Sequence, residues 1–140
     1  MDPGVLYISL HAHPAYLYPG TGFESEVGSG PGRGYTLNIP FLPGATDDDY
    51  KTAFEGRVIP AIERYAPQFM LLSVGFDGHT ADPLGNLDLT DDAFAWMTQA
   101  IVERANNQAG GRILSVLEGG YNLDVLGRCV TEHVRLLAGT

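Results

Sequence analysis

The chain has 140 residues, of which 44% are hydrophobic and 18% are charged, and its formal net charge is −9. This composition indicates a globular domain rather than a disordered segment. The acidic balance argues against nucleic-acid binding, which needs clustered Lys and Arg. The longest apolar runs are too short to cross a bilayer, and the first residues resemble no secretory signal. The single cysteine, Cys129, is expected to be a reduced core residue rather than a nucleophile, so we predict a cytoplasmic protein. Because the apolar runs are short, we expect no membrane partner.

Hydrophobic periodicity predicts strands and helices that alternate along the chain. The first predicted elements are a strand at residues 5–9, a Gly-rich loop at 10–34 and a strand at 35–40. A helix then starts near Thr46 and Asp47 and is kinked or divided at Pro60, and a buried strand at 69–75 and a loop at 77–89 follow it. The last elements are a helix capped by Thr90 and ended by Gly110 and Gly111, a buried strand at 113–117, and a helix capped by Asn122. This order predicts an α/β fold with a mostly parallel sheet. Ligands of such sheets bind beyond the carboxyl ends of the strands, so we expect the functional residues in the loops after residues 9, 75 and 117.

The loop after the strand at 69–75 holds the first candidate residue. Asp77 follows a buried strand, and a carboxylate fixed there suits a metal ligand. The alternative is a loop aspartate that accepts backbone N–H groups. His79 is a weaker metal candidate that is more simply a hydrogen-bonding partner, and Asp82, which precedes a proline, is most simply a turn residue.

The loop after the strand at 113–117 holds the second candidate. Gly119 and Gly120 allow close approach of a ligand to the backbone, and Tyr121 could donate its hydroxyl proton to a developing oxyanion. The alternative is a tight turn with a packed tyrosine. His11 and His13 form a His-x-His pair, which is a weak metal signal when it stands alone.

Six short segments occur in the same order as in a known enzyme superfamily. They are Val5-Leu6-Tyr7-Ile8-Ser9-Leu10-His11, Tyr18-Pro19-Gly20-Thr21-Gly22, Tyr35-Thr36-Leu37-Asn38-Ile39-Pro40, Gly75-Phe76-Asp77-Gly78-His79, Asp82-Pro83-Leu84-Gly85 and Leu117-Glu118-Gly119-Gly120-Tyr121. Together they resemble the histone deacetylase superfamily, and most of all its class II and bacterial branch. That branch includes deacetylase-like amidohydrolases, acetylpolyamine amidohydrolases and acetoin-utilisation proteins.

The resemblance implies roles for residues in the loops that follow the strands at 69–75 and 113–117. Asp77 resembles a zinc-binding aspartate, and Tyr121 resembles the tyrosine that hydrogen-bonds the substrate carbonyl. Gly119 and Gly120 resemble the wall of the acetyl pocket. His79 matches at most a position behind the metal ligands.

The resemblance also implies roles for residues before position 36. Tyr18, or its neighbour Leu17, matches an aromatic position that lines the acyl-lysine channel. Ser9, Leu10 and Tyr35 match positions whose oxygens help to hold a structural K⁺ or Na⁺. The histidines of the His-x-His pair match no ligand, which removes the metal interpretation for them.

The family's His-His pair and its Asp-x-His segment have no counterpart in this sequence, because both lie upstream of the strand that begins here at Val5. The resemblance therefore implies that residues 1–140 are the C-terminal part of a histone deacetylase-like domain, with a three-layer α/β/α, arginase-like fold. The implied enzyme is a Zn²⁺-dependent hydrolase of acetyl-lysine peptides or acetylpolyamines, and we expect the isolated chain to be inactive and prone to self-association through an exposed sheet edge. The alternatives are a non-catalytic remnant or interaction module of the same fold, and an arginase-like hydrolase, against which the Gly119-Gly120-Tyr121 segment speaks.

Overall fold

The computed structural model describes residues 2–139 and has an α/β fold in which all paired strands are parallel. The chain divides into two compact units, residues 1–45 and residues 46–140, and each is described by itself. In the described part of the chain, no helix is both long enough and apolar enough to cross a membrane.

The first unit contains strands β1 (Tyr7–Ala12) and β2 (Thr36–Phe41), which pair in parallel from Tyr7 opposite Thr36 to Ala12 opposite Phe41. A short 3₁₀ turn (Gly30–Gly32) lies in the loop between them. Both strands start later than the sequence pattern predicts. The pairing begins where the Tyr7 N–H donates to the Tyr35 carbonyl, at 2.9 Å, because the residues before it form a turn. It runs on as far as the bond from the His13 N–H to the Phe41 carbonyl.

The second unit begins with a helix that changes its winding. Helix α1 (Asp47–Ala53) continues into a π-helical turn (Phe54–Val58) and then into α2 (Ile59–Tyr65). Within the turn, the Ile59 N–H donates to the Phe54 carbonyl, five residues back. Pro60 follows directly, has no N–H to donate, and would clash with a carbonyl four residues earlier in a regular α-helix. The sequence predicts a kink or a division at Pro60, and the structure changes the helical winding in the turn just before it, at Phe54–Val58.

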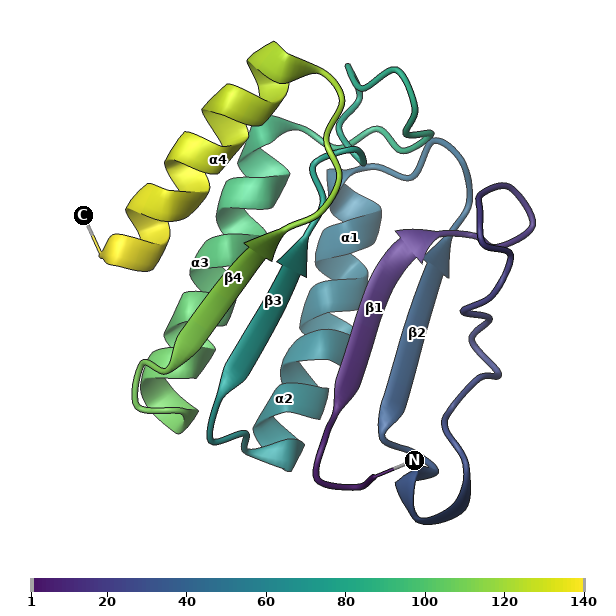
Figure 1. The fold of residues 1–140 in the computed structure, drawn as a ribbon, viewed down its shortest axis with the longest axis vertical. Helices are drawn as coiled ribbons and strands as arrows, with labels where there is room; N and C mark the ends of the chain where they lie inside the picture. The colour runs from purple at the N-terminus through teal and green to yellow at the C-terminus, as the bar shows by residue number, and fades with distance from the viewer. Residues whose placement is uncertain (1, 140) are drawn as a thin grey trace. The chain divides into compact units, whose positions relative to one another are not determined.

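The remaining elements of the second unit are β3 (Met70–Val74), α3 (Asp91–Gln108), β4 (Ile113–Leu117) and α4 (Leu123–Ala138). Strands β3 and β4 pair in parallel, with Met70 opposite Ile113, and the helices of this unit lie on one side of them (Figure 1). On the other side, Leu71 and Leu114 are 66% and 52% exposed. The prediction that both strands are buried is therefore wrong for this face in the described structure.

Two of the predicted helix caps differ in outcome. The Asn122 side chain accepts the Val125 N–H at 3.2 Å, which confirms it as the cap of α4. Thr90 stands at the cap position of α3, but its hydroxyl donates to Asp47 Oδ2 at 2.6 Å and makes no capping bond. The predicted position of Thr90 at the start of α3 is confirmed, whereas its side chain forms no capping hydrogen bond.

Candidate functional site

The loops that follow β3 and β4 lie against each other at the carboxyl ends of the two strands (Figure 1). The Glu118 N–H donates to the Val74 carbonyl, and the Phe76 N–H donates to the Gly119 carbonyl, both at 2.9 Å. The parallel pairing therefore continues past the last residue of each strand. This places the residues that follow Gly75 beside those that follow Leu117, as the order of elements predicted.

The Asp77 carboxylate lies directly over the backbone of Gly119. A Cβ atom at position 119 would stand 2.7 Å from Asp77 Oδ1 and 2.9 Å from Oδ2. A Cβ at position 75 would stand 2.5 Å from the same Oδ1. Only glycine at positions 75 and 119 leaves room for the carboxylate in this position.

No group in residues 2–139 hydrogen-bonds the Asp77 carboxylate or forms an ion pair with it. Its negative charge acts on Tyr50, a buried residue of α1. The pKa of Tyr50 is raised well above its ordinary value, first by burial and then by the charge of Asp77. A half-buried carboxylate without a partner is the kind of group that accepts a cation.

Gly120 and Tyr121 follow as the end of the second loop. Gly120 has φ +135°, which strongly favours glycine, and a Cβ there would stand 2.8 Å from Leu126 Cδ1 and 3.3 Å from Phe76 Cβ. The Tyr121 side chain is 55% exposed. Within the described structure its phenol hydroxyl has no hydrogen-bond partner. The structure thus brings Asp77 together with the Gly119–Tyr121 segment and leaves the phenol open to a ligand.

His79 is occupied by other contacts. Its Nδ1 accepts the Ala81 N–H at 3.0 Å, so Nε2 carries the ring proton and donates to Asp91 Oδ1 at 2.8 Å. Arg128 also binds Asp91, through Nε at 2.9 Å and one terminal nitrogen at 3.2 Å. The Arg128 hydrogen bonds and charge, together with His79, hold the pKa of Asp91 below its usual range although burial raises it. His79 is therefore the hydrogen-bonding partner that the sequence favoured over a metal ligand.

Asp82 does more than the turn role that the sequence predicts. Its Oδ1 accepts the N–H groups of Leu84 and Gly85, which is the expected turn, at 2.9 and 3.2 Å. Its Oδ2 accepts the N–H groups of Tyr121 and Asn122, at 2.7 and 3.1 Å. Local sequence carries no signal for the second pair, because these partners lie 39 and 40 residues away.

Cys129 and His133 face the core, as the sequence predicts. Burial, and then the charge of Asp91, raises the pKa of the Cys129 thiol to about 11, so the reactive thiolate form is suppressed. The His133 ring lies between the hydroxyls of Thr98 and Ser115, each at 2.8 Å.

The residues predicted to hold a structural cation lie in the first unit. Ser9 and Leu10 are on β1, and the Tyr35 carbonyl lies at the start of the β1–β2 pairing. His11 Nε2 lies 2.9 Å from the Gly22 carbonyl, which can only accept, so in the neutral ring Nδ1 accepts the Ser9 hydroxyl proton at 2.7 Å. The lone pairs of Ser9 Oγ thus remain available for a cation. About three residues of strand, or roughly 10 Å, separate Ser9 from Tyr35, so the two would serve different ions.

Leu17 and Tyr18 lie in the Gly-rich loop of the first unit. Tyr18 is 92% exposed and precedes a cis peptide bond to Pro19. Both residues line a hollow of about 250 Å³ that also includes Ser9 and His11.

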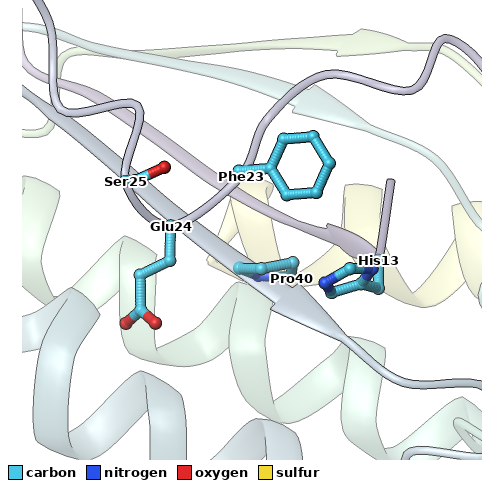
Figure 2. Close-up of a pocket in the computed structure, with 5 residues that line it drawn as sticks. All are labelled: His13, Phe23, Glu24, Ser25 and Pro40. Atoms are coloured by element: carbon cyan, nitrogen blue, oxygen red, sulfur yellow. The ribbon is translucent and has the colours of Figure 1, made fainter. Parts of the chain in front are cut away.

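A larger hollow of about 580 Å³ in the same unit is lined by five residues: His13, Phe23, Glu24, Ser25 and Pro40 (Figure 2). The His13 and Phe23 rings meet edge to face, with centroids 5.7 Å apart. None of the site residues predicted from the sequence lines this hollow, so its size alone assigns it no role.

The described residues gather no group of three His, Cys, Asp or Glu side chains that could hold a metal ion. A catalytic zinc site usually has about three protein ligands and one open position. Asp77 fits one of these ligands by its chemistry and its free oxygens. The remaining ligands of such a site have no candidates in residues 2–139.

Comparison with known proteins relates this geometry to one family. The sequence pattern of the histone deacetylase domain matches residues 1–137. The chain is 42% identical to histone deacetylase 15 of Arabidopsis thaliana over 140 residues, which are 99% of the chain and 25% of that protein. It is 38% identical to a histone deacetylase-like amidohydrolase of Pseudomonas aeruginosa, over 96% of the chain and 35% of that protein. The chain therefore spans between a quarter and about a third of the length of these two relatives.

Solved structures give the same relation. The HDA15 HD domain matches with a TM-score of 0.89 at 42% identity, over 96% of this chain and 37% of that one. The histone deacetylase Clr3 matches with a TM-score of 0.90 at 39% identity, over 99% of this chain and 23% of that one.

Proposed function

Because the chain belongs to the histone deacetylase family, we propose that it forms part of a zinc-dependent deacetylase that hydrolyses the amide bond of acetylated amines. One observation carries the proposal. The free carboxylate of Asp77 lies against Gly119, two residues before a tyrosine whose hydroxyl is also free. The two side chains would supply a metal ligand and a carbonyl-binding group at the same edge of a parallel sheet.

In this proposal Asp77 supplies one zinc ligand. The strand before it and the glycines beside it fix the direction of its carboxylate. Zinc, when bound in a hydrolase, acts as a Lewis acid toward the substrate carbonyl and activates water. The other ligands, and the histidines that transfer protons, would come from polypeptide outside residues 2–139.

Tyr121 would donate its hydroxyl proton in a hydrogen bond to the oxygen of the substrate carbonyl. That bond strengthens as negative charge develops on the oxygen, and a donor of this kind is worth roughly 3–4 kcal/mol in comparable sites. The backbone of Gly119 and Gly120, which bears no side chain, would form a wall of the acetyl pocket.

The acetyl group would be carried by a lysine peptide or a polyamine. Both substrates bear positive charge, and the net charge of −9 favours their approach. We extend the proposal to the first unit, where Leu17 or Tyr18 would contact the acyl chain, and the oxygens of Ser9, Leu10 and Tyr35 would bind K⁺ or Na⁺. The cytoplasm is our proposed location, because the single cysteine is a buried thiol.

A second candidate is a non-catalytic module of the same fold. It is favoured by the single metal-ligand candidate in the described residues, since one carboxylate alone binds zinc weakly.

A graft distinguishes the two candidates. The chain replaces the matching stretch of the Arabidopsis histone deacetylase 15 domain, and zinc content and deacetylation of an acetyl-lysine peptide and an acetylpolyamine are measured. We expect the grafted protein to bind stoichiometric zinc and to be active, and we expect Asp77→Asn to abolish both the zinc binding and the activity. The control Asp88→Asn changes an exposed carboxylate of the same loop and should leave both unchanged. A grafted protein that folds and retains zinc after Asp77→Asn would refute the ligand assignment, and one that folds but is inactive with Asp77 intact would favour the non-catalytic module.

A further inference from the structure

The loop that carries Asp77 and the loop that carries Tyr121 are joined by one carboxylate. Asp82 is 8% exposed and accepts four backbone N–H groups, two from its own loop and two from the Tyr121 loop. An uncharged side chain could not replace it at equal strength, because hydrogen bonds to an ionised acceptor are roughly twice as strong as neutral ones.

The carboxylate is charged in the folded protein. Burial raises its pKa, but the N–H groups of Tyr121, Leu84, Gly85 and Asn122 lower it further, and the net pKa lies below the ordinary aspartate value. No Lys or Arg side chain in the described structure pairs with Asp82. Backbone N–H groups therefore compensate its charge, which makes them hard to move without exposing the carboxylate.

The hydrogen bonds to Tyr121 and Asn122 hold the backbone that carries the Tyr121 side chain. The Tyr121 N–H bond, at 2.7 Å, is the shortest of the four and fixes the backbone from which the phenol projects. The Asn122 side chain adds a bond from Nδ2 to the Ala81 carbonyl at 2.9 Å, next to Asp82 in sequence. At the other side of the same loop, His79 holds it to Asp91 at the start of α3.

We propose that Asp82 is a positioning residue, whose carboxylate sets the place of Tyr121 relative to Asp77 by binding the backbone of both loops. The effect of Asp82 on catalysis rests on the proposed function. The link that Asp82 makes between the two loops is independent of that function. Asp82 itself touches no substrate in this scheme and acts only through Tyr121.

Amide hydrogen exchange in the 140-residue chain tests the link directly. In the wild-type chain we expect the amides of Tyr121 and Asn122 to be protected at least tenfold relative to an unstructured peptide. Asp82→Asn keeps the shape of the side chain but turns one acceptor into a donor, and it should raise exchange at these two amides at least tenfold. The amide of Ile101, in the middle of α3, should change less than twofold, and Asp88→Asn should change none of the three.

Several results would overturn the inference. Unprotected Tyr121 and Asn122 amides in the wild-type chain would do so even if Asp82→Asn fails to fold. An equal rise at Ile101 would show that the substitution weakens the whole unit and does not act on one loop.

The grafted enzyme tests the catalytic step. Asp82→Asn should lower kcat by roughly 10²-fold, as loss of an oxyanion donor does, with KM changed less than threefold. Adding it to Tyr121→Phe should lower kcat less than threefold further, because both changes act through one hydroxyl. Multiplicative losses would contradict the positioning role. An inactive graft would count against the proposed function alone, since the exchange measurements still decide the link.

Discussion

Replacing His133 with glutamine tests a pH dependence that the buried imidazole imposes on folding. The hydroxyl proton of Thr98 goes to the Phe94 carbonyl at 2.8 Å, so Thr98 accepts the Nδ1–H of His133. In the neutral ring, Nε2 is then the acceptor for the Ser115 hydroxyl. Both ring nitrogens therefore have partners in the neutral form, and burial, which disfavours the charged form, lowers the pKa of His133 below 6.5.

The sign and size of the effect follow from proton linkage. Near and below pH 6.5 the unfolded chain binds more proton at this position than the folded chain does, so the free energy of unfolding falls as the pH falls. The contribution is fully present above the unfolded pKa. The loss between about pH 8 and about pH 5.5 is at most roughly 1.4 kcal/mol, the limit for a ring that stays neutral in the fold.

The assay is urea unfolding followed by the fluorescence of Trp96, the only tryptophan, which lies on α3 and reports on the second unit. Wild type should lose more stability than His133→Gln between those two pH values, by at most about 1.4 kcal/mol, because glutamine stays neutral throughout. His13→Gln changes a histidine of the first unit and should leave the wild-type loss of the second unit unchanged. Equal losses in wild type and His133→Gln would refute the reasoning.

Three further outcomes are expected. Tyr121→Phe in the grafted enzyme should keep zinc and lower kcat by roughly 10²–10³-fold, whereas a change of only a few-fold would return the side chain to a packing role. Gly120→Ala should lower the free energy of unfolding by about 1–3 kcal/mol, measured in urea, because φ is +135° and the new Cβ meets Leu126; Gly127→Ala, in open space on α4, should not destabilise and serves as its control. The 140-residue chain alone, assayed with zinc and an acetylated peptide, should show no turnover. Zinc-dependent turnover that Asp77→Ala abolishes would contradict the conclusion that this chain lacks the other zinc ligands.

The meeting of the two loops could be predicted from sequence because it depends on strand direction alone. Once residues 69–75 and 113–117 are identified as parallel strands, Asp77 and Gly119 must emerge at the same edge. The disturbance of the helix near Pro60 could equally be predicted, since a missing N–H is a local property.

Three features that the sequence did not predict depend on distant parts of the chain. Asp82 has an ordinary turn sequence around it, and its second pair of partners is visible only in three dimensions. Thr90 occupies the predicted cap position, yet its hydroxyl binds Asp47 of another helix and makes no bond to the first turn of α3. An apolar run such as residues 69–75 shows that a strand can be buried, but only neighbouring polypeptide covers it, and Leu71 remains exposed.

The environment of Cys129 makes this chain a convenient subject for site-specific probes. The only thiol is buried and resists ionisation, so thiol-reactive dyes and spin labels should ignore it under native conditions. A cysteine introduced at an exposed position, such as 88, would then be the sole reactive thiol without removal of the natural one. A pair of such cysteines, one in each unit, would allow distances between the units to be measured in solution.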